Sequence, residues 1–344
     1  MHKNQHFASD NNAGICPSVL ATMLQNDSQH LSAYGEDPLT AQLIAQTREL
    51  FETDCQVFMV YSGTAANSLS LSALVQPYQS IVAHQTAHIQ VDECSAPEFF
   101  TGGAKLITVA GEHGKLTPQQ IEAVVTQRDD VHFPRVKAIS LTQSTEMGTV
   151  YSVEELARIH EVKQQYGLRL HMDGARFANA VATLGVAPRQ ITWEVGVDVL
   201  SFGGTKNGLM AGEMVVFFNP SYAEGFEYRI KQAGQLASKM RYLSGGWLGL
   251  LADETWLKNA RHANDMAERL YQRLKRMDGV RILFPRQANV VFAELPTSAI
   301  EGLYALGWHF YIFIGKNGCR LMCAWDTLPE TVDAFADDLQ ALLG

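Results

Sequence analysis

The sequence predicts an α/β protein whose large domain is built on a mostly parallel sheet. Seven short apolar runs, rich in β-branched residues, alternate with longer amphipathic segments, which is typical of parallel strands joined by helices. The pattern changes near residue 245, after which a charged helix, four short strands and a last helix indicate a smaller α+β domain. A chain of 344 residues is long enough for two such cores.

The elements can be placed in order along the chain. The strands predicted for the large sheet are residues 57–61, 81–83, 106–109, 136–141, 168–172, 197–202 and 214–218. Amphipathic segments predict helices over 38–53, 118–127, 153–166 and 175–184, two of which begin near a proline, where the missing N–H costs nothing. In the smaller domain we expect helices over 256–277 and 329–343, and strands over 280–284, 290–295, 310–314 and 320–325.

These elements divide the chain into three parts. Residues 1–14 are predicted to form an N-terminal arm, residues 15–245 the large domain, and residues 246–344 the small C-terminal domain. The first 40 residues carry few strong signals and are rich in Asn, Asp, Ser and Gly, so an extended arm is expected there. No apolar run is long enough to suggest a membrane span.

Composition limits the partners and the compartment. The net charge is −9 and no run of basic residues exceeds a pair, so neither nucleic acid nor an anionic membrane is an expected partner. The five cysteines are odd in number and scattered, and the first residues lack an apolar targeting segment, so a reduced, cytoplasmic protein is expected. Cys319 and Cys323 could suggest a metal site, but buried strand thiols are favoured, and no metal is expected.

A lysine lies where ligands of open α/β sheets bind. The predicted strand 197–202 runs into Gly203-Gly204-Thr205-Lys206-Asn207-Gly208, at the carboxyl end of a buried strand. Lys206 is either a solvated loop charge or a nucleophile whose amine condenses with an aldehyde. Its own surroundings do not decide between the two.

A carboxylate lies at the corresponding place one crossover earlier. The predicted strand 168–172 ends at Asp173, so this side chain and Lys206 are expected to be neighbours at one edge of the sheet. Enzymes that use pyridoxal phosphate (PLP) need both a lysine and an acid that keeps the pyridine nitrogen protonated. Alternatively, Asp173 caps the helix 175–184.

A third segment predicts an anion site. The predicted strand 57–61 is followed by Ser62-Gly63-Thr64-Ala65-Ala66-Asn67, which opens a helix. Backbone N–H groups at a helix N-terminus, together with Ser and Thr hydroxyls, bind phosphate. The sequence contains no glycine fingerprint for a nucleotide.

Taken together, these segments resemble the threonine aldolase (beta-eliminating lyase) family of fold-type I PLP enzymes. The resemblance runs in family order over nearly the whole chain. The matching stretches are Ala8-Ser9-Asp10-Asn11, Ala33-Tyr34-Gly35-Glu36-Asp37-Pro38, Ser62-Gly63-Thr64-Ala65-Ala66-Asn67, Thr86-Ala87-His88, Val131-His132-Phe133, His171-Met172-Asp173-Gly174-Ala175-Arg176, Gly204-Thr205-Lys206 and Cys319-Arg320-Leu321.

The resemblance implies the retro-aldol cleavage of L-threonine or a related L-β-hydroxy-α-amino acid to glycine and an aldehyde. It implies a role for each matching residue. Lys206 would hold the cofactor covalently, Asp173 would face its ring nitrogen, Gly63 and Thr64 would bind its phosphate, and His88 would stack on its ring. Ser9, Arg176 and Arg320 would bind the substrate carboxylate, with Arg176 also counted among the cofactor-binding residues.

The identity of the catalytic base stays open. His88 is favoured, but the resemblance also places His132 on the reacting side, so that a water held by both histidines is the alternative. Tyr34 and a basic residue, chosen as Arg241 over Lys231 and Lys239, would reach the site of a neighbouring subunit in a homodimer or homotetramer. The stretch Leu141-Thr142-Gln143-Ser144-Thr145-Glu146 departs from better-known members and suggests a branch that prefers phenylserine.

Three rival functions remain. Another fold-type I PLP enzyme, an aminotransferase or a β-eliminating lyase, would share Lys206 and Asp173. A nucleotide-binding oxidoreductase would share the sheet, but it would need a glycine fingerprint that the sequence lacks. A regulator without activity would keep the fold alone.

Overall fold

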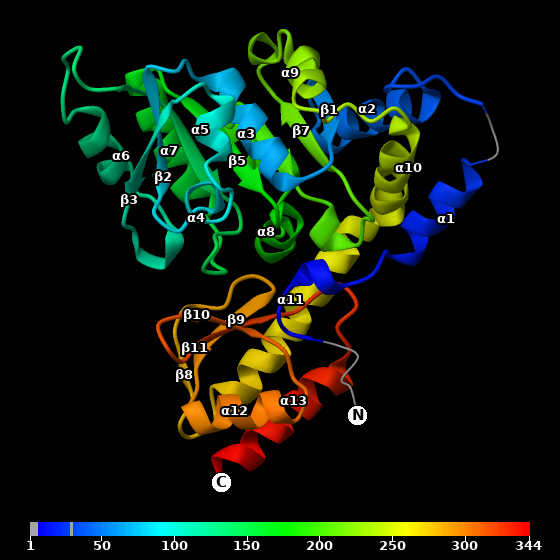
Figure 1. The fold of residues 1–344 in the computed structure, drawn as a ribbon, viewed down its shortest axis with the longest axis vertical. Helices are drawn as coiled ribbons and strands as arrows, with labels where there is room; N and C mark the ends of the chain where they lie inside the picture. Colours follow the sequence, from blue (N-terminus) through cyan, green and yellow to red (C-terminus); the bar gives the residue numbers. More distant parts are fainter. Residues whose placement is uncertain (1–5, 28–29) are drawn as a thin grey trace.

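The computed structural model describes residues 6–27 and 30–344, so the first five residues of the predicted arm lie outside the described residues. Figure 1 shows a large α/β part and a small α+β part, with the long helix α11 (Thr255–Leu274) running from one to the other. The predicted fold class is therefore confirmed.

The large sheet contains seven strands in the order β1-β7-β6-β5-β4-β2-β3. Their bounds are β1 Gln56–Val60, β2 Gln79–His84, β3 Lys105–Val109, β4 Arg135–Thr142, β5 Arg169–Gly174, β6 Val199–Phe202 and β7 Glu213–Phe217, so all seven predicted strands are confirmed. Only β7 is antiparallel to its neighbours, β1 and β6. The carboxyl ends of the other six strands therefore share one edge of the sheet, and β7 begins at that edge.

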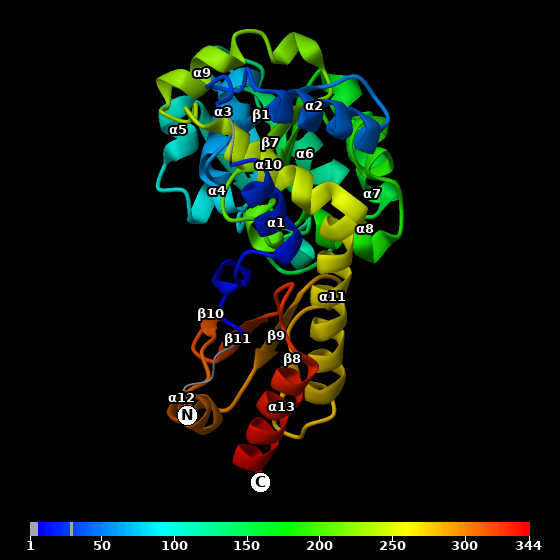
Figure 2. The same cartoon turned by 90° about the vertical axis from the view of Figure 1, so that its right-hand side faces the viewer.

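Helices cover both faces of this sheet (Figure 2). One apolar cluster joins a face of the sheet to α2 (Pro38–Phe51), α6 (Pro118–Val125), α7 (Val153–Tyr166), α8 (Phe177–Leu184) and α10 (Met240–Leu251). A second cluster joins the other face to α3 (Gly63–Leu74), α5 (Ala96–Phe100) and α9 (Phe226–Gln232). Val199 and Leu200, which are adjacent on β6, belong to different clusters because side chains alternate along a strand.

The small part is an antiparallel sheet covered by helices. Its strands lie in the order β10-β11-β9-β8, with bounds β8 Arg281–Ile282, β9 Val290–Glu294, β10 Tyr311–Ile314 and β11 Gly318–Met322. Helices α11, α12 (Thr297–Ala305) and α13 (Pro329–Leu343) complete it. The four predicted strands and the last helix are confirmed, whereas α12 was not predicted. The thiols of Cys319 and Cys323 are buried in this core.

The N-terminal segment connects the two parts. The backbone of Phe7 bonds to His309 and Met322, and its ring packs against Trp308 and Phe335 in the small core. Nearer the large domain, a short turn η1 (Asp10–Asn12) follows. Phe7 thus anchors the described part of the arm to the small core.

The expectation of an extended arm over 40 residues is wrong from Pro17 to Gln25, which form helix α1. Apart from Pro17 at its start, this helix has few local signals: it has no side-chain cap, and its Leu20 and Leu24 are exposed. Its packing on α10 supplies the stability that local signals do not. The predicted domain boundary between residues 245 and 246 falls within α10, and the division into domains remains a prediction.

Among the helices of the described ranges, none combines the length and the apolar character that crossing a membrane requires.

A buried ion pair fixes β6 beside β5. The Oδ2 atom of Asp198 accepts a hydrogen bond from the backbone N–H of Leu170 at 2.7 Å and lies 2.9 Å from Nζ of Lys163 on α7. The backbone N–H of Asp198 in turn donates to the carbonyl oxygen of Leu170. These bonds set the register of the two strands at whose ends Asp173 and the Lys206 turn lie.

We predict that Asp198→Ala lowers the free energy of unfolding by about 3 kcal/mol, because it removes the anionic partner of the mostly buried ammonium of Lys163, which keeps only the carbonyl oxygen of Gly196. Urea denaturation measures the change. The control is Asp130→Ala, which removes the exposed partner of Arg128 and should leave the midpoint nearly unchanged. Equal effects of the two variants would contradict the prediction.

Candidate active site

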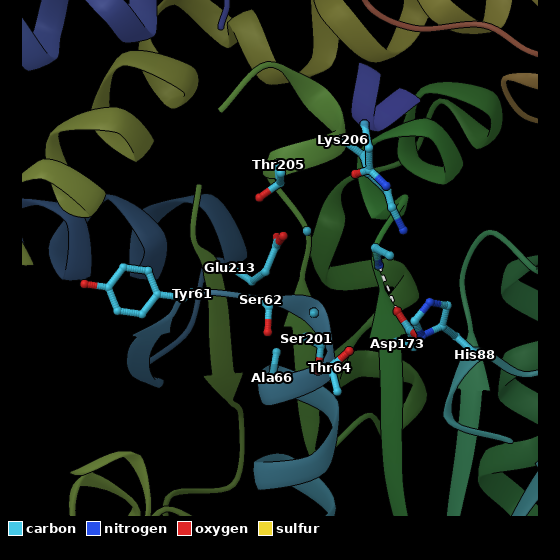
Figure 3. A pocket seen from close by; sticks show the side chains of 14 residues that line it. Tyr61, Ser62, Thr64, Ala66, His88, Asp173, Ser201, Thr205, Lys206 and Glu213 are labelled. Carbon is cyan, nitrogen blue, oxygen red and sulfur yellow. Dashed lines mark hydrogen bonds between the residues drawn. The ribbon is translucent and has the colours of Figure 1, made fainter. Parts of the chain in front are cut away.

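A cavity of about 240 Å³ opens at the carboxyl edge of the large sheet. Its walls come from the ends of β1, β5 and β6, the start of β7, the segment after β2, and the N-terminal turn η1 (Figure 3). Five of the residues predicted for the site line this cavity: Gly63, Thr64, His88, Asp173 and Lys206.

Lys206 lies in a tight turn that only glycines permit. β6 ends at Phe202, and a Cβ on the next residue, Gly203, would lie 2.5 Å from the carbonyl oxygen of Ala175. A Cβ on Gly204 would lie 2.4 Å from Leu209 and 2.6 Å from Trp247. The two glycines therefore let the chain turn directly behind the pocket. The Lys206 side chain extends into the pocket (Figure 3), and no salt bridge to its amine is present among the described residues.

Asp173 lies beside this turn, at the end of β5. Its carboxylate is 3% exposed and accepts two hydrogen bonds, from the N–H of Ala175 at 3.0 Å and from Nδ2 of Asn67 at 3.0 Å. Helix α8 begins at Phe177 with Arg176 as its N-cap, so Asp173 does not cap this helix. Asp173 was expected either to cap a helix or to face a ligand. In the structure it faces the cavity.

The N-terminus of α3 forms the opposite wall. Ser62 caps this helix through a bond from the N–H of Ala65 to its Oγ, so Gly63 and Thr64 form the first turn. The first turn carries no acidic side chain. Across the pocket, the hydroxyl of Thr205 lies beside the carboxyl group of Glu213, whose pKa it lowers. Free N–H groups of a helix N-terminus with a hydroxyl nearby suit an anion.

Glu213 also lines the cavity and was not predicted. It is the first residue of β7, is 8% exposed, and accepts a hydrogen bond from the N–H of Gly204 at 2.6 Å. Burial raises the pKa of its carboxyl group above the ordinary value. The sequence could not reveal this position, because Glu213 reaches the edge only by virtue of the reversed direction of β7.

His88 opens the short helix α4 (His88–Val91) and is held by a carboxylate that the sequence did not identify. Its Nδ1 lies 2.8 Å from Oε1 of Glu93, and the same oxygen accepts a bond from Nδ2 of Asn67 at 2.8 Å. The bond to Glu93 raises the pKa of His88, although burial lowers it. A histidine with one nitrogen held and the other free can exchange protons at the cavity.

The predicted carboxylate-binding residues gather around the start of η1. Arg176 forms a buried, two-bond ion pair with Asp10, through Nε at 2.7 Å and Nη2 at 2.9 Å. Nη2 of Arg320 donates to the carbonyl oxygen of Ala8 at 3.2 Å, and Ser9 Oγ accepts from the N–H of Asn11. The structure therefore brings Ser9, Arg176 and Arg320 together.

The two arginines differ in how far they are already paired. Burial lowers the pKa of Arg176, but the charge of Asp10 and the hydrogen bonds to it have a larger combined effect, so the pKa of the guanidinium is raised. Burial and the nearby Arg176 lower the pKa of Arg320, whose buried Nε has no hydrogen-bond partner in the structure. The guanidinium of Arg320 lies over the ring of Phe313 at 4.9 Å. Arg320 is thus the less neutralised of the two.

His132 is not brought to this cavity within one chain. It lies exposed in the loop before β4, at the amino edge of the sheet, and its N–H donates to Asp130. β4 is eight residues long, and at about 3.3 Å per residue the two edges are roughly 25 Å apart. Its expected catalytic role therefore has no geometric support in a single subunit.

Tyr34 and Arg241 lie outside the cavity lining. Tyr34 is 50% exposed and lies under the ammonium of Lys231, which is 4.9 Å from the ring centre. Arg241, at the start of α10, has a buried Nε without a hydrogen-bond partner in the structure.

Comparisons with known proteins agree with this arrangement. A family model described as beta-eliminating lyase matches residues 6–297. The chain is 50% identical to a low specificity L-threonine aldolase from Pseudomonas sp. (strain NCIMB 10558), over 99% of both chains. It is 51% identical to the protein of that name from Pseudomonas aeruginosa, over 99% of this chain and 98% of the relative.

A solved structure is similar throughout. The threonine aldolase of Leishmania major superposes with a TM-score of 0.94 at 28% identity, over 98% of this chain and 99% of that chain. The match includes both the large and the small part. The chain therefore belongs to the beta-eliminating lyase family.

Proposed function

We propose that this protein is a PLP-dependent aldehyde-lyase that cleaves L-threonine or a related L-β-hydroxy-α-amino acid to glycine and an aldehyde. The observation that carries the proposal is that one cavity contains a lysine, a buried carboxylate and a helix N-terminus. Relatives that are half identical over their full length are named low specificity L-threonine aldolase. Cleavage to glycine and an aldehyde distinguishes the proposed enzyme from an aminotransferase, which would share Lys206 and Asp173.

The residues present fit PLP. The N–H groups of Gly63 and Thr64 at the start of α3 and the hydroxyl of Thr205 suit its phosphate. The buried carboxylate of Asp173 suits its ring nitrogen, and the amine of Lys206 suits its aldehyde. When bound, this cofactor withdraws electrons from the bond that breaks.

The protein's own groups would select that bond. The carboxylate of Asp173, oriented by two hydrogen bonds, would keep a proton on the ring nitrogen by its negative charge. His88 accepts the proton of the substrate's β-hydroxyl, directly or through a water. A water held jointly with His132 would require His132 from another subunit, because His132 lies at the opposite edge of the same sheet.

The substrate carboxylate would be bound mainly by Arg320, with Ser9 and Arg176 beside it. Asp10 already takes two donors of Arg176, whereas Arg320 keeps an unpaired Nε. A guanidinium grips a carboxylate with two parallel bonds and so fixes the substrate's orientation.

The proposal extends to the assembly and the compartment. A homodimer or homotetramer would bring Tyr34 and Arg241 to a neighbouring subunit's cofactor, and the exposed ring of Tyr34 supports this role. All five cysteines are free thiols, which supports a reducing, cytoplasmic location.

Lys206→Ala is expected to abolish aldehyde release and, with it, the visible absorbance band that borohydride removes from PLP proteins, because Lys206 is the one lysine among the described residues that line the cavity. Spectra and aldehyde assays on the purified protein measure both. Lys206→Arg is the control, since it keeps the charge but cannot condense with an aldehyde. A variant that keeps the band would refute the role of Lys206.

Arg320→Ala is expected to raise KM for the amino acid by about 10- to 100-fold, because a hydrogen-bonded charged partner contributes about 1.5–3 kcal/mol. Steady-state kinetics measure the change. Arg320→Lys should recover part of the loss, because it restores a point charge without the paired geometry. An unchanged KM in both variants would exclude this role.

The departure from better-known members at residues 141–146 suggested a branch of the family that prefers substrates with bulkier side chains. This preference remains a prediction. Glycine release is expected from L-threonine, L-allo-threonine and L-phenylserine, with the largest kcat/KM for L-phenylserine. The same panel includes the D-forms, from which no glycine is expected. Cleavage of a D-form would contradict the proposed substrate class, and a lower kcat/KM for L-phenylserine than for L-threonine would contradict the branch.

A further inference from the structure

Glu93 has a buried carboxyl group for which the functions described above provide no role. It follows α4 and is 3% exposed. Its Oε1 accepts hydrogen bonds from Nδ1 of His88 and from Nδ2 of Asn67, both at 2.8 Å. Its Oε2 is buried and has no hydrogen-bond partner in the structure. Leaving a carboxyl oxygen unpaired is costly, so packing alone does not explain this residue.

The contacts of Oε1 determine which nitrogen of His88 carries the proton. An ionised carboxylate can only accept, so with Glu93 ionised both Asn67 Nδ2 and His88 Nδ1 donate to Oε1. The direction of this bond therefore belongs to the ionised form of Glu93, which has no proton to donate. In neutral His88 the lone pair is then on Nε2.

Asn67 links the same carboxyl group to Asp173. Its Nδ2 has two hydrogens, and its two acceptors are Oε1 of Glu93 at 2.8 Å and Oδ2 of Asp173 at 3.0 Å. One amide group therefore fixes the positions of both carboxyl groups. Figure 3 shows His88 beside Asp173 at the wall of the pocket.

We propose that Glu93 is a positioning residue, which holds His88 in the tautomer protonated on Nδ1 and leaves Nε2 as the base that takes the substrate's β-hydroxyl proton. Asn67 joins this pair to Asp173. The catalytic part of the proposal rests on the proposed function. The tautomer of His88 does not, since it follows from contacts within the protein.

The charges around His88 set the direction of its pH dependence. The hydrogen bond to Glu93 raises the pKa of His88, burial lowers it by less, and the carboxylates of Asp173 and Glu146 raise it further. The neutral histidine is the form that can accept a proton, so kcat/KM should fall as the pH drops through the raised pKa. Removing the charge of Glu93 should therefore move this acid limb to lower pH.

The test compares Glu93→Gln with Glu93→Ala. A glutamine keeps a carbonyl oxygen that can accept from both His88 and Asn67, whereas an alanine removes the acceptor. The first readout is NMR of the protein labelled with ¹⁵N-histidine, before and after PLP is added, with the His88 signals assigned through His88→Asn. The wild type should show a proton on Nδ1. Glu93→Gln should keep that tautomer but lower the pKa of His88 by about one unit, and Glu93→Ala should give a mixture of tautomers.

The second readout is the pH profile of aldehyde release. Glu93→Gln should shift the acid limb of kcat/KM by the same amount as the NMR titration, and Glu93→Ala should lower kcat by about tenfold or more with KM changed by less. Glu112→Gln is the matched control, because Glu112 lies 3.4 Å from His113 at the surface and should leave His88 unchanged.

The outcomes separate the two proposals. If the tautomer and pKa of His88 are the same in wild type, Glu93→Gln and Glu93→Ala, Glu93 does not position it. If Glu93→Ala does not fold, Glu93→Gln still decides, since an unshifted pKa refutes the electrostatic coupling. If the wild type releases no aldehyde while the NMR results hold, the proposed function fails and the pairing of Glu93 with His88 stands.

Discussion

The parallel pairing of β5 with β6 is the constraint on which the rest of the site depends. This pairing sets Asp173 opposite Ser201 and Gly174 opposite Phe202, so the chain leaves both strands at the same edge of the sheet. Glycines 203 and 204 then turn the chain sharply and bring Lys206 over the cavity. Because β7 runs in the opposite direction between β6 and β1, the N-terminus of α3 arrives at the same edge.

The site keeps many charges close together by pairing most of them. Asp10 neutralises Arg176, two hydrogen bonds hold Asp173, and Glu213 accepts from the backbone of the lysine turn. Two groups that the proposed reaction needs, the amine of Lys206 and the Nε of Arg320, are left without such a partner among the described residues. Buried charges are stable only when compensated, so this division agrees with the proposed roles.

The sequence was most informative where function depends on strand ends and local turns. All seven strands of the large sheet were predicted, and so was the adjacency of Asp173 and Lys206, because both follow from periodicity and crossover length. Glu93 and Glu213 were missed because their contacts depend on a short helix and on one reversed strand. For His132 a motif suggested proximity to the site, but the strand that follows it separates it from the cavity.

The central claim is that Lys206 is the residue that binds PLP covalently. The most direct measurement is mass spectrometry of peptides from the purified protein after incubation with PLP and reduction with borohydride. The account predicts one modified peptide, with the pyridoxyl mass on Lys206. A modification on another lysine, or an unmodified Lys206 in a protein that cleaves threonine, would contradict it.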